Sequence, residues 1–581
     1  MSLFLRLPGA LYRHFWAIWG FGLVLIVLVS AGMFWRGWRD VGFNAAADDR
    51  PPAIAKPSRL VALCFGVFLV LYIAFMLWGE DFAYQDGHWF TGFTAIGIPR
   101  PPSIWTESGR FWPLGYDEYN LIAYLSPTAT AYLVFGAILL VVGMWVLYRV
   151  MPSSSPTLRL LTFVVLMMAP AFGVDFAELT YADRNVAFAV CMLVFLVDRY
   201  DRRPALSWLL PAIVVSYSAL YYKETTAALF GGFAISRLLI RASRDGWRSA
   251  LRSPLEVGIL LSCACFGVEL ASILFPAGRS KYVDENFVGR LTATARYMTA
   301  DPLLTVFLIA FGIHVVSTLR RGAKFDPLWD ALAAGGALHF VAICFTGLEE
   351  DYLMGPTELV AALTLLRLVP RWWQERPSVR PILAGVGGLA IAATMTFGTY
   401  RLIQRKNVVH QTQRIAAFVV NRYREPSNRK ERLYHLDSHE TSIMNFVAFL
   451  EYKGMQLHRH GEPPGVQAPD FAGDERFLAD RCVYYEDYIC RNDAMRLGDV
   501  VIRLPDDTRS PVAPPGTTLQ TLFQVSPPDS FPLLRPLLAI LYRVSPTMRG
   551  YFRNRPLPDD WVRVSAAKLV ASDVTANAQP K

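Results

Sequence analysis

Residues 60–78 read LVALCFGVFLVLYIAFMLW, a run without a charged side chain. A helix needs about 20 mostly apolar residues to cross a bilayer, so this segment is predicted to span a membrane. Gly79-Glu80-Asp81 follows it at once, which puts two carboxylates at the end of the predicted span. Apolar runs of this kind recur along the first 400 residues, and they decide the fold class.

Counting these runs predicts a polytopic α-helical membrane protein with about 12 transmembrane helices. The runs lie near 15–35, 58–78, 121–148, 159–174, 185–198, 205–221, 225–240, 254–275, 302–318, 327–346, 356–370 and 381–400. Arg36 and Trp38 follow the first run directly, with no small-residue cleavage site, so we expect a retained anchor.

The composition agrees with a membrane protein. Hydrophobic residues make up 53% of the 581 residues and charged residues 18%, with a mean hydropathy of +0.29. A soluble globular protein carries about 25% charged residues. The composition therefore excludes a disordered, fibrous or purely cytosolic protein.

The positive charge is a topology signal. The formal net charge is +9, and one set of alternate short loops holds more than twice as many Lys and Arg residues as the opposite set. Because cytoplasmic loops are enriched in Lys and Arg, the richer set is predicted to be cytoplasmic. No nucleic-acid partner is needed to explain the charge.

A shift in composition near residue 400 predicts two domains, a transmembrane domain over 1–400 and a soluble α/β domain over 401–581. The second domain follows an outward-going span, so it is predicted to lie in the periplasm, with the protein in the inner membrane. Its expected elements are helices over 401–425 and 440–453 and strands over 433–436, 481–485 and 499–503. Cys482 and Cys490 would lie in an oxidising compartment, which favours a disulfide.

Polar residues gather at the predicted outer ends of the spans. Besides Glu80-Asp81, three segments combine charges with aromatic residues or tight turns: Gly109–Gly115, Glu178–Asn185 and Tyr221–Thr225. Ionisable groups near span ends are costly unless they line a wet cavity, which favours a polar cleft over a solvated rim. For Lys223 and Glu224, a mutual ion pair and phosphate binding are both open interpretations.

The pattern resembles the GT-C superfamily of membrane glycosyltransferases, which includes protein O-mannosyltransferases, lipid A aminoarabinose transferases and mycobacterial arabinosyltransferases. The resemblance covers about residues 55–400. It depends on an acidic pair that opens the first large outer loop, and on three further short motifs: Glu80-Asp81, Gly109-Arg110-Phe111, Asp183-Arg184-Asn185 and Tyr222-Lys223-Glu224. An extra span before the acidic loop departs from the common GT-C arrangement.

The resemblance implies transfer of a sugar from a polyprenyl-phosphate donor to an extracytoplasmic glycan, lipid or protein. A carboxylate would take the proton of the acceptor hydroxyl while cations stabilise the leaving phosphate. The roles it implies are Asp81 as general base with Glu80 second, a phosphate grip of Arg110, Lys223 and Arg184, and sugar contacts from Glu178, Asp183 and Glu224.

No cofactor and no resident metal are expected, although the acidic loop leaves a divalent cation open. Two other membrane functions remain as alternatives: a transporter or flippase for a lipid-linked glycan, and an O-antigen polymerase or ligase. Transporters need broken helices and polar groups near the membrane midplane, whereas the charges here cluster at predicted span ends.

Overall fold

The computed structural model describes residues 2–41, 56–83, 87–106, 109–152, 155–277, 286–348, 350–428, 431, 433–435, 440–455, 458–459, 482–485, 487–490, 495, 497–504, 513–525 and 564–571. The chain forms two compact units. Unit 1 comprises Met1–Leu77, Pro102–Glu118 and Leu133–Leu402, and unit 2 comprises Trp78–Pro101, Tyr119–Tyr132 and Ile403–Lys581. The first long loop is therefore divided between the two units.

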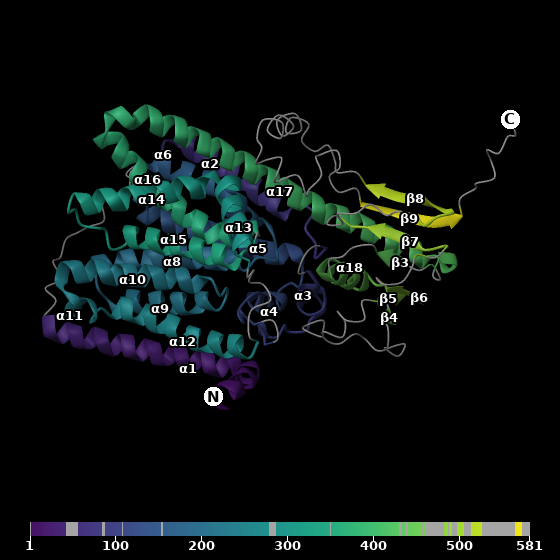
Figure 1. Ribbon diagram of the computed structural model, residues 1–581, viewed down its shortest axis with the longest axis horizontal. Coiled ribbons are helices and arrows are strands. Elements are labelled where there is room, and N and C mark those ends of the chain that lie inside the picture. The colour runs from purple at the N-terminus through teal and green to yellow at the C-terminus, as the bar shows by residue number, and fades with distance from the viewer. Residues whose placement is uncertain are drawn as a thin grey trace. The chain divides into compact units, whose positions relative to one another are not determined.

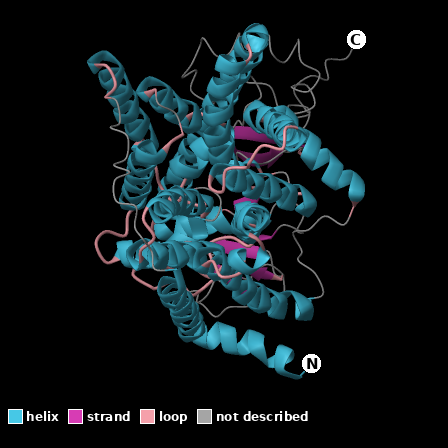
Figure 2. Ribbon diagram, turned by 90° about the vertical axis from the view of Figure 1, so that its left-hand side faces the viewer, coloured by secondary structure: helices cyan, strands magenta, loops and turns pink. Residues whose placement is uncertain are grey.

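Helices make up most of the described structure, and strands are few (Figure 2). The helices before residue 402 are α1 (Ser2–Val41), α2 (Arg59–Leu77), α3 (His88–Thr91), α4 (Glu118–Ala123), α5 (Ala129–Val150), α6 (Pro156–Met167), α7 (Pro170–Ala177), α8 (Asp183–Arg202), α9 (Leu206–Leu220), α10 (Thr226–Asp245), α11 (Trp247–Ala250), α12 (Pro254–Ala277), α13 (Phe287–Ala300), α14 (Pro302–Arg320), α15 (Trp329–Thr346) and α16 (Gly355–Glu375). The last long helix, α17 (Arg380–Arg424), continues past residue 402.

In the part of the chain that the structure describes, eight helical segments are long and apolar enough to cross a membrane: Leu11–Arg36, Arg59–Leu77, Ala129–Val150, Pro254–Ala277, Pro302–Arg320, Trp329–Thr346, Tyr352–Glu375 and Pro377–Arg424. A ninth is added if α6 and α7, which meet at 73°, count as one broken span. By the length and composition of its helices, the chain is a multi-pass helical membrane protein.

Ten of the twelve apolar runs each fall on one helix, whereas the run 121–148 covers the end of α4, a short non-helical stretch and α5, and the run 159–174 covers α6 and α7. Three of these helices, α8, α9 and α10, are not among the eight segments that are long and apolar enough to cross a membrane. Helix α9 has 15 residues, and α8 and α10 contain several charged residues. The number of twelve spans therefore stays a prediction.

Close helix packing in unit 1 uses glycine. The helices α1, α9, α10 and α12 run side by side (Figure 1). A Cβ atom at Gly232 of α10 would lie 2.7 Å from Leu338 of α15, and one at Gly335 of α15 would lie 2.6 Å from the Leu229 carbonyl oxygen. Small residues let helices approach closely in membrane proteins, and here they bring α10 against α15.

Buried ion pairs also link helices of unit 1. The Arg237 side chain of α10 is fully buried and pairs with Asp201 of α8 at 2.7 Å and with Glu256 of α12 at 2.8 Å. Buried charges are tolerated when they are paired and hydrogen-bonded. Arg237 therefore joins three helices.

Unit 2 contains the C-terminal part of α17, the helix α18 (Glu440–Tyr452) and two sheets. The four-stranded sheet has the order β3-β7-β9-β8, formed by β3 (Leu433–His435), β7 (Val500–Arg503), β9 (Val564–Ala571) and β8 (Thr517–Val525). Strands β3 and β7 are parallel, and the other two pairs are antiparallel. Helix α18 follows β3 and ends before Gly454, whose φ of +94° favours glycine (Figure 1).

The second sheet is antiparallel, with the order β4 (His458–Arg459), β5 (Cys482–Tyr485) and β6 (Asp487–Cys490). The expected strands and the helix 440–453 occur close to their predicted positions. Cys482 and Cys490 are register partners in the β5–β6 ladder. Their side chains lie outside the described part of the chain, so the disulfide stays a prediction.

Candidate functional site

The Arg110 loop of unit 1 is attached to the turn between α9 and α10. Glu224 Oε1 accepts hydrogen bonds from Arg110 Nε at 2.8 Å and from the Phe111 amide at 3.0 Å. The Leu114 amide donates to the Tyr221 carbonyl oxygen at 3.0 Å. These three hydrogen bonds hold Arg110 beside the Lys223-Glu224 dipeptide, 114 residues later in the chain.

Lys223 pairs with Asp183 rather than with its neighbour Glu224. Its Nζ lies 3.3 Å from Asp183 Oδ2 and 5.0 Å from the centre of the Tyr352 ring. Asp183 is the first residue of α8, where a negative charge is favoured by the helix dipole. Tyr352 in turn stacks on Tyr181 at 4.1 Å. The Lys223 ammonium is thus held between a carboxylate and an aromatic ring.

Asp175 of α7 is a carboxylate that the sequence-based site missed. Its side chain is fully buried, and neither oxygen has a hydrogen-bond partner among the described residues. Lys223 and Asp183 both act on it electrostatically. Gly355 lies against it, and a Cβ atom there would collide with the Asp175 Oδ2 atom. Lys223 therefore compensates two buried carboxylates.

The Arg184 side chain is buried against the backbone of the turn that precedes α8. Its fully buried guanidinium donates to the carbonyl oxygens of Glu178 at 3.0 Å and Leu179 at 3.4 Å, and lies 3.8 Å from Glu118. Glu118 also accepts a 2.6 Å hydrogen bond from the Asn185 side chain. The guanidinium holds together the turn that precedes α8. These contacts suit a structural role better than phosphate binding.

Glu118 and Glu224 lie outside the membrane-spanning segments, and their carboxyl groups differ in acidity. Burial raises the pKa of the Glu118 carboxyl above its ordinary value, and the Arg184 guanidinium and the Asn185 amide only partly offset this effect. Burial also disfavours the charged form of Glu224. The Arg110 guanidinium and the Lys223 ammonium outweigh that effect, so the pKa of Glu224 lies below its ordinary value of 4.5. Glu224 therefore stays ionised and keeps Arg110 in place.

A hydroxyl–imidazole network adjoins the cluster. His339 of α15 lies 3.2 Å from the Thr225 hydroxyl through Nε2 and 2.7 Å from the Thr357 hydroxyl through Nδ1. His339 is almost completely buried. Because Thr225 follows Glu224 directly, this network connects the α9–α10 turn to α15 and α16. No local motif in the sequence indicated it.

Glu80 and Asp81 belong to unit 2, and each contacts a lysine of that unit. Glu80 pairs with Lys406 of α17, and both side chains are buried, with 1% and 5% exposed. Asp81 Oδ2 lies 2.6 Å from Lys453 Nζ, and Asp81 Oδ1 accepts a hydrogen bond from the Phe82 amide at 2.9 Å. The Asp81 side chain keeps 22% of its surface exposed. Of the two acids, Asp81 is the accessible one.

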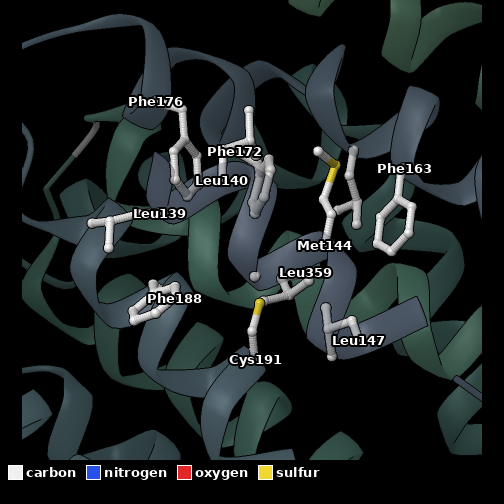
Figure 3. A pocket seen from close by; sticks show the side chains of 12 residues that line it. Leu139, Leu140, Met144, Leu147, Phe163, Phe172, Phe176, Phe188, Cys191 and Leu359 are labelled. Carbon is white, nitrogen blue, oxygen red and sulfur yellow. The ribbon is translucent and has the colours of Figure 1, made fainter. Parts of the chain in front are cut away.

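A small apolar cavity lies inside unit 1 between α5, α6, α7, α8 and α16 (Figure 3). Its lining includes Met144, Phe163, Phe172, Phe176 and Cys191, and all of its lining residues are apolar. The side chains that line this cavity offer no hydrogen-bond partner to a sugar. Phe172 and Phe176 lie on α7, the helix that also carries Asp175.

The structure brings together six of the eight residues expected at the site, all in unit 1: Arg110, Glu178, Asp183, Arg184, Lys223 and Glu224. Residues of this region that are not among the eight expected at the site are Glu118, Asp175, His339 and Tyr352. Within the described ranges, no group of three His, Cys, Asp or Glu side chains is placed to hold a metal ion.

The chain matches no known family model, and no curated protein is similar to it in sequence.

Proposed function

We propose that this chain is an integral membrane glycosyltransferase that moves a sugar from a polyprenyl-phosphate donor to an extracytoplasmic acceptor. The observation that carries the proposal is the pairing of Lys223 with Asp183 and of Arg110 with Glu224 in one cluster of unit 1. Cations held in loops and turns between the helices of a membrane protein suit the recognition of a lipid-linked phosphate. Carboxylates beside them suit sugar hydroxyl groups.

The reaction is a displacement at the anomeric carbon. The acceptor oxygen forms a bond to that carbon, and the bond from the carbon to the phosphate oxygen breaks. The acceptor proton passes to a carboxylate, and the phosphate leaves with the bonding electron pair. Lys223 and Arg110 stabilise the charge on the phosphate, while Glu224, with 18% of its side chain exposed, contacts the sugar. Asp183 and Glu178 are buried, so in this proposal they support the cluster.

Asp81 is the general base in this proposal. Glu80 has 1% of its side chain exposed, so it is poorly suited to take a proton from an acceptor. Asp81 keeps 22% of its side chain exposed and follows the last residue of α2 by four positions in the sequence. The Arg184 side chain is fully buried, whereas Arg110 and Lys223 keep 16% and 11% of their side chains exposed, so the proposed phosphate-binding cations are Arg110 and Lys223.

The proposal places the protein in the inner membrane, with residues 401–581 in the periplasm. Its partners are then the prenyl-linked sugar donor, membrane lipid, and a glycan, lipid or protein acceptor of the cell envelope. No nucleotide sugar is available there, which accounts for the choice of a lipid-linked donor.

Transfer of radiolabelled sugar from a panel of polyprenyl-phosphate sugars, with purified full-length protein and cell-envelope acceptors, tests the proposal. Asp81→Asn is expected to abolish transfer, and Asp245→Asn at the exposed end of α10 serves as the matched control. Wild-type protein that transfers no sugar from any donor contradicts the proposal. Full activity of Asp81→Asn removes Asp81 from the role of base.

A further inference from the structure

The segment from Trp78 to Asp81 is held by residues more than 300 positions later in the chain. The Trp78 ring stacks on the His410 ring at 6.4 Å, and the Gly79 carbonyl oxygen accepts a 2.7 Å hydrogen bond from Gln413. All of these residues belong to unit 2. The acidic segment therefore belongs to the same compact unit as His410 and Gln413 of α17.

One face of α17 makes three of these contacts. Lys406, His410 and Gln413 are spaced by four and three residues, which places them on one side of the helix. They contact Glu80, Trp78 and Gly79, respectively. A single helical stripe therefore fixes the backbone that leads to Asp81, and Gly79 turns that backbone with a φ of +65°.

Helix α18 supplies the fourth contact. Lys453 follows the last residue of α18, and its ammonium lies 4.9 Å from the Phe449 ring centre and 5.3 Å from the Tyr452 ring centre. The Tyr452 ring also packs against Phe82 at 5.7 Å. These aromatic contacts limit the positions that the lysine can adopt, and its Nζ lies 2.6 Å from the Asp81 carboxylate.

The two lysine–acid pairs differ in access. Glu80 and Lys406 are buried, whereas Asp81 and Lys453 keep 22% and 39% of their side chains exposed. A partly exposed ion pair contributes little to stability, typically about 0–1 kcal/mol. The 2.6 Å ion pair between Lys453 and Asp81 therefore suits a role in orienting the Asp81 carboxylate better than a role in stabilising the fold.

We propose that Lys453 is a positioning residue that orients the Asp81 carboxylate, so that the C-terminal part of the chain directly serves the reacting group. This inference rests on the proposed function, because it takes Asp81 as the base. Residues of α17 hold the acidic segment at Trp78, Gly79 and Glu80, and Lys453 holds it at the Asp81 carboxylate.

The experiment compares Lys453→Met, Lys453→Arg and the matched control Lys568→Met in the full chain. Lys568 also forms a 2.7 Å ion pair, with Glu431, and is 34% exposed. Lys453→Met is expected to lower kcat about 10- to 100-fold through misplacement of the base, with little change in KM or in Tm. Lys453→Arg is expected to restore most of kcat, and Lys568→Met to behave as wild type.

A second measurement does not need activity. Labelling with an amine-reactive reagent, followed by mass spectrometry, is expected to rise at Lys453 in Asp81→Asn and to stay constant at Lys568. Unchanged labelling of Lys453, or wild-type kcat in Lys453→Met, overturns the inference. Absence of transfer by the wild type overturns the proposed function instead, so the two failures are distinguishable.

Discussion

The Lys223 ammonium lies 3.3 Å from the Asp183 carboxylate, whereas the adjacent Glu224 pairs with Arg110. Two neighbouring residues of opposite charge thus have different partners from different parts of unit 1. This cross-pairing joins the Arg110 loop, the α9–α10 turn and the start of α8 into one polar cluster.

Removing Lys223 is expected to destabilise the protein more than removing the whole pair. Asp183 and Asp175 are both buried, and Lys223→Met leaves them without a compensating charge. The expected loss in the free energy of unfolding is about 3 kcal/mol. The double variant Lys223→Met/Asp183→Asn removes one of these charges and is expected to have a higher Tm than the single variant. Thermal unfolding in detergent measures both. A double variant less stable than Lys223→Met contradicts the pairing.

The Glu224–Arg110 pair predicts a pH dependence of stability. Since the pKa of Glu224 is lowered in the folded state, its ionised form stabilises the fold above its ordinary pKa of 4.5, and this contribution is lost as the pH falls through the lowered value. The difference in Tm between wild type and Glu224→Gln is therefore expected to be largest near neutral pH and to shrink on acidification below 4.5. A difference that does not change with pH would show that the charge of Glu224 contributes nothing.

The close contact between Gly355 and Asp175 predicts that alanine is not tolerated at position 355. The added Cβ atom would collide with the buried carboxylate and force α7 or α16 to move, at a cost of about 1–3 kcal/mol. Gly312→Ala on α14 is the matched control, because no atom lies within 4 Å of the added Cβ. Tm and the yield of membrane-inserted protein check the prediction. Equal behaviour of the two variants argues against the packing of Asp175 on Gly355.

Much of the secondary structure could be predicted from local patterns. The apolar runs fall on helices, and the short strand at Leu433, the helix over 440–453 and the strand at Val500 occur where periodicity indicates them. The segment 401–425 is helical but forms one helix with the preceding apolar run. Hydropathy and periodicity are properties of short stretches of sequence, so they predict a helix or strand without knowledge of the segment that packs against it.

The candidate site was predictable only in part. Short polar motifs at span ends identified Arg110, Asp183, Lys223 and Glu224, but left open whether Lys223 pairs with Glu224. Asp175 was missed because it directly follows the apolar run 159–174 and lies outside the nearest polar segment, Glu178–Asn185. The resemblance ranked Asp81 ahead of Glu80 as base, but it gave no sign that Glu80 is buried against Lys406 while Asp81 stays accessible beside Lys453.

The amino-acid sequence alone determined the helical, membrane-spanning character of this protein, because a bilayer-length apolar run has few other stable solutions. Tertiary structure alone decided which charges meet. Arg110 and Glu224 are 114 residues apart, and Asp81 and Lys453 are 372 apart. The energy of an ion pair depends on distance and burial in space, and neither quantity can be read from the position of a residue along the chain.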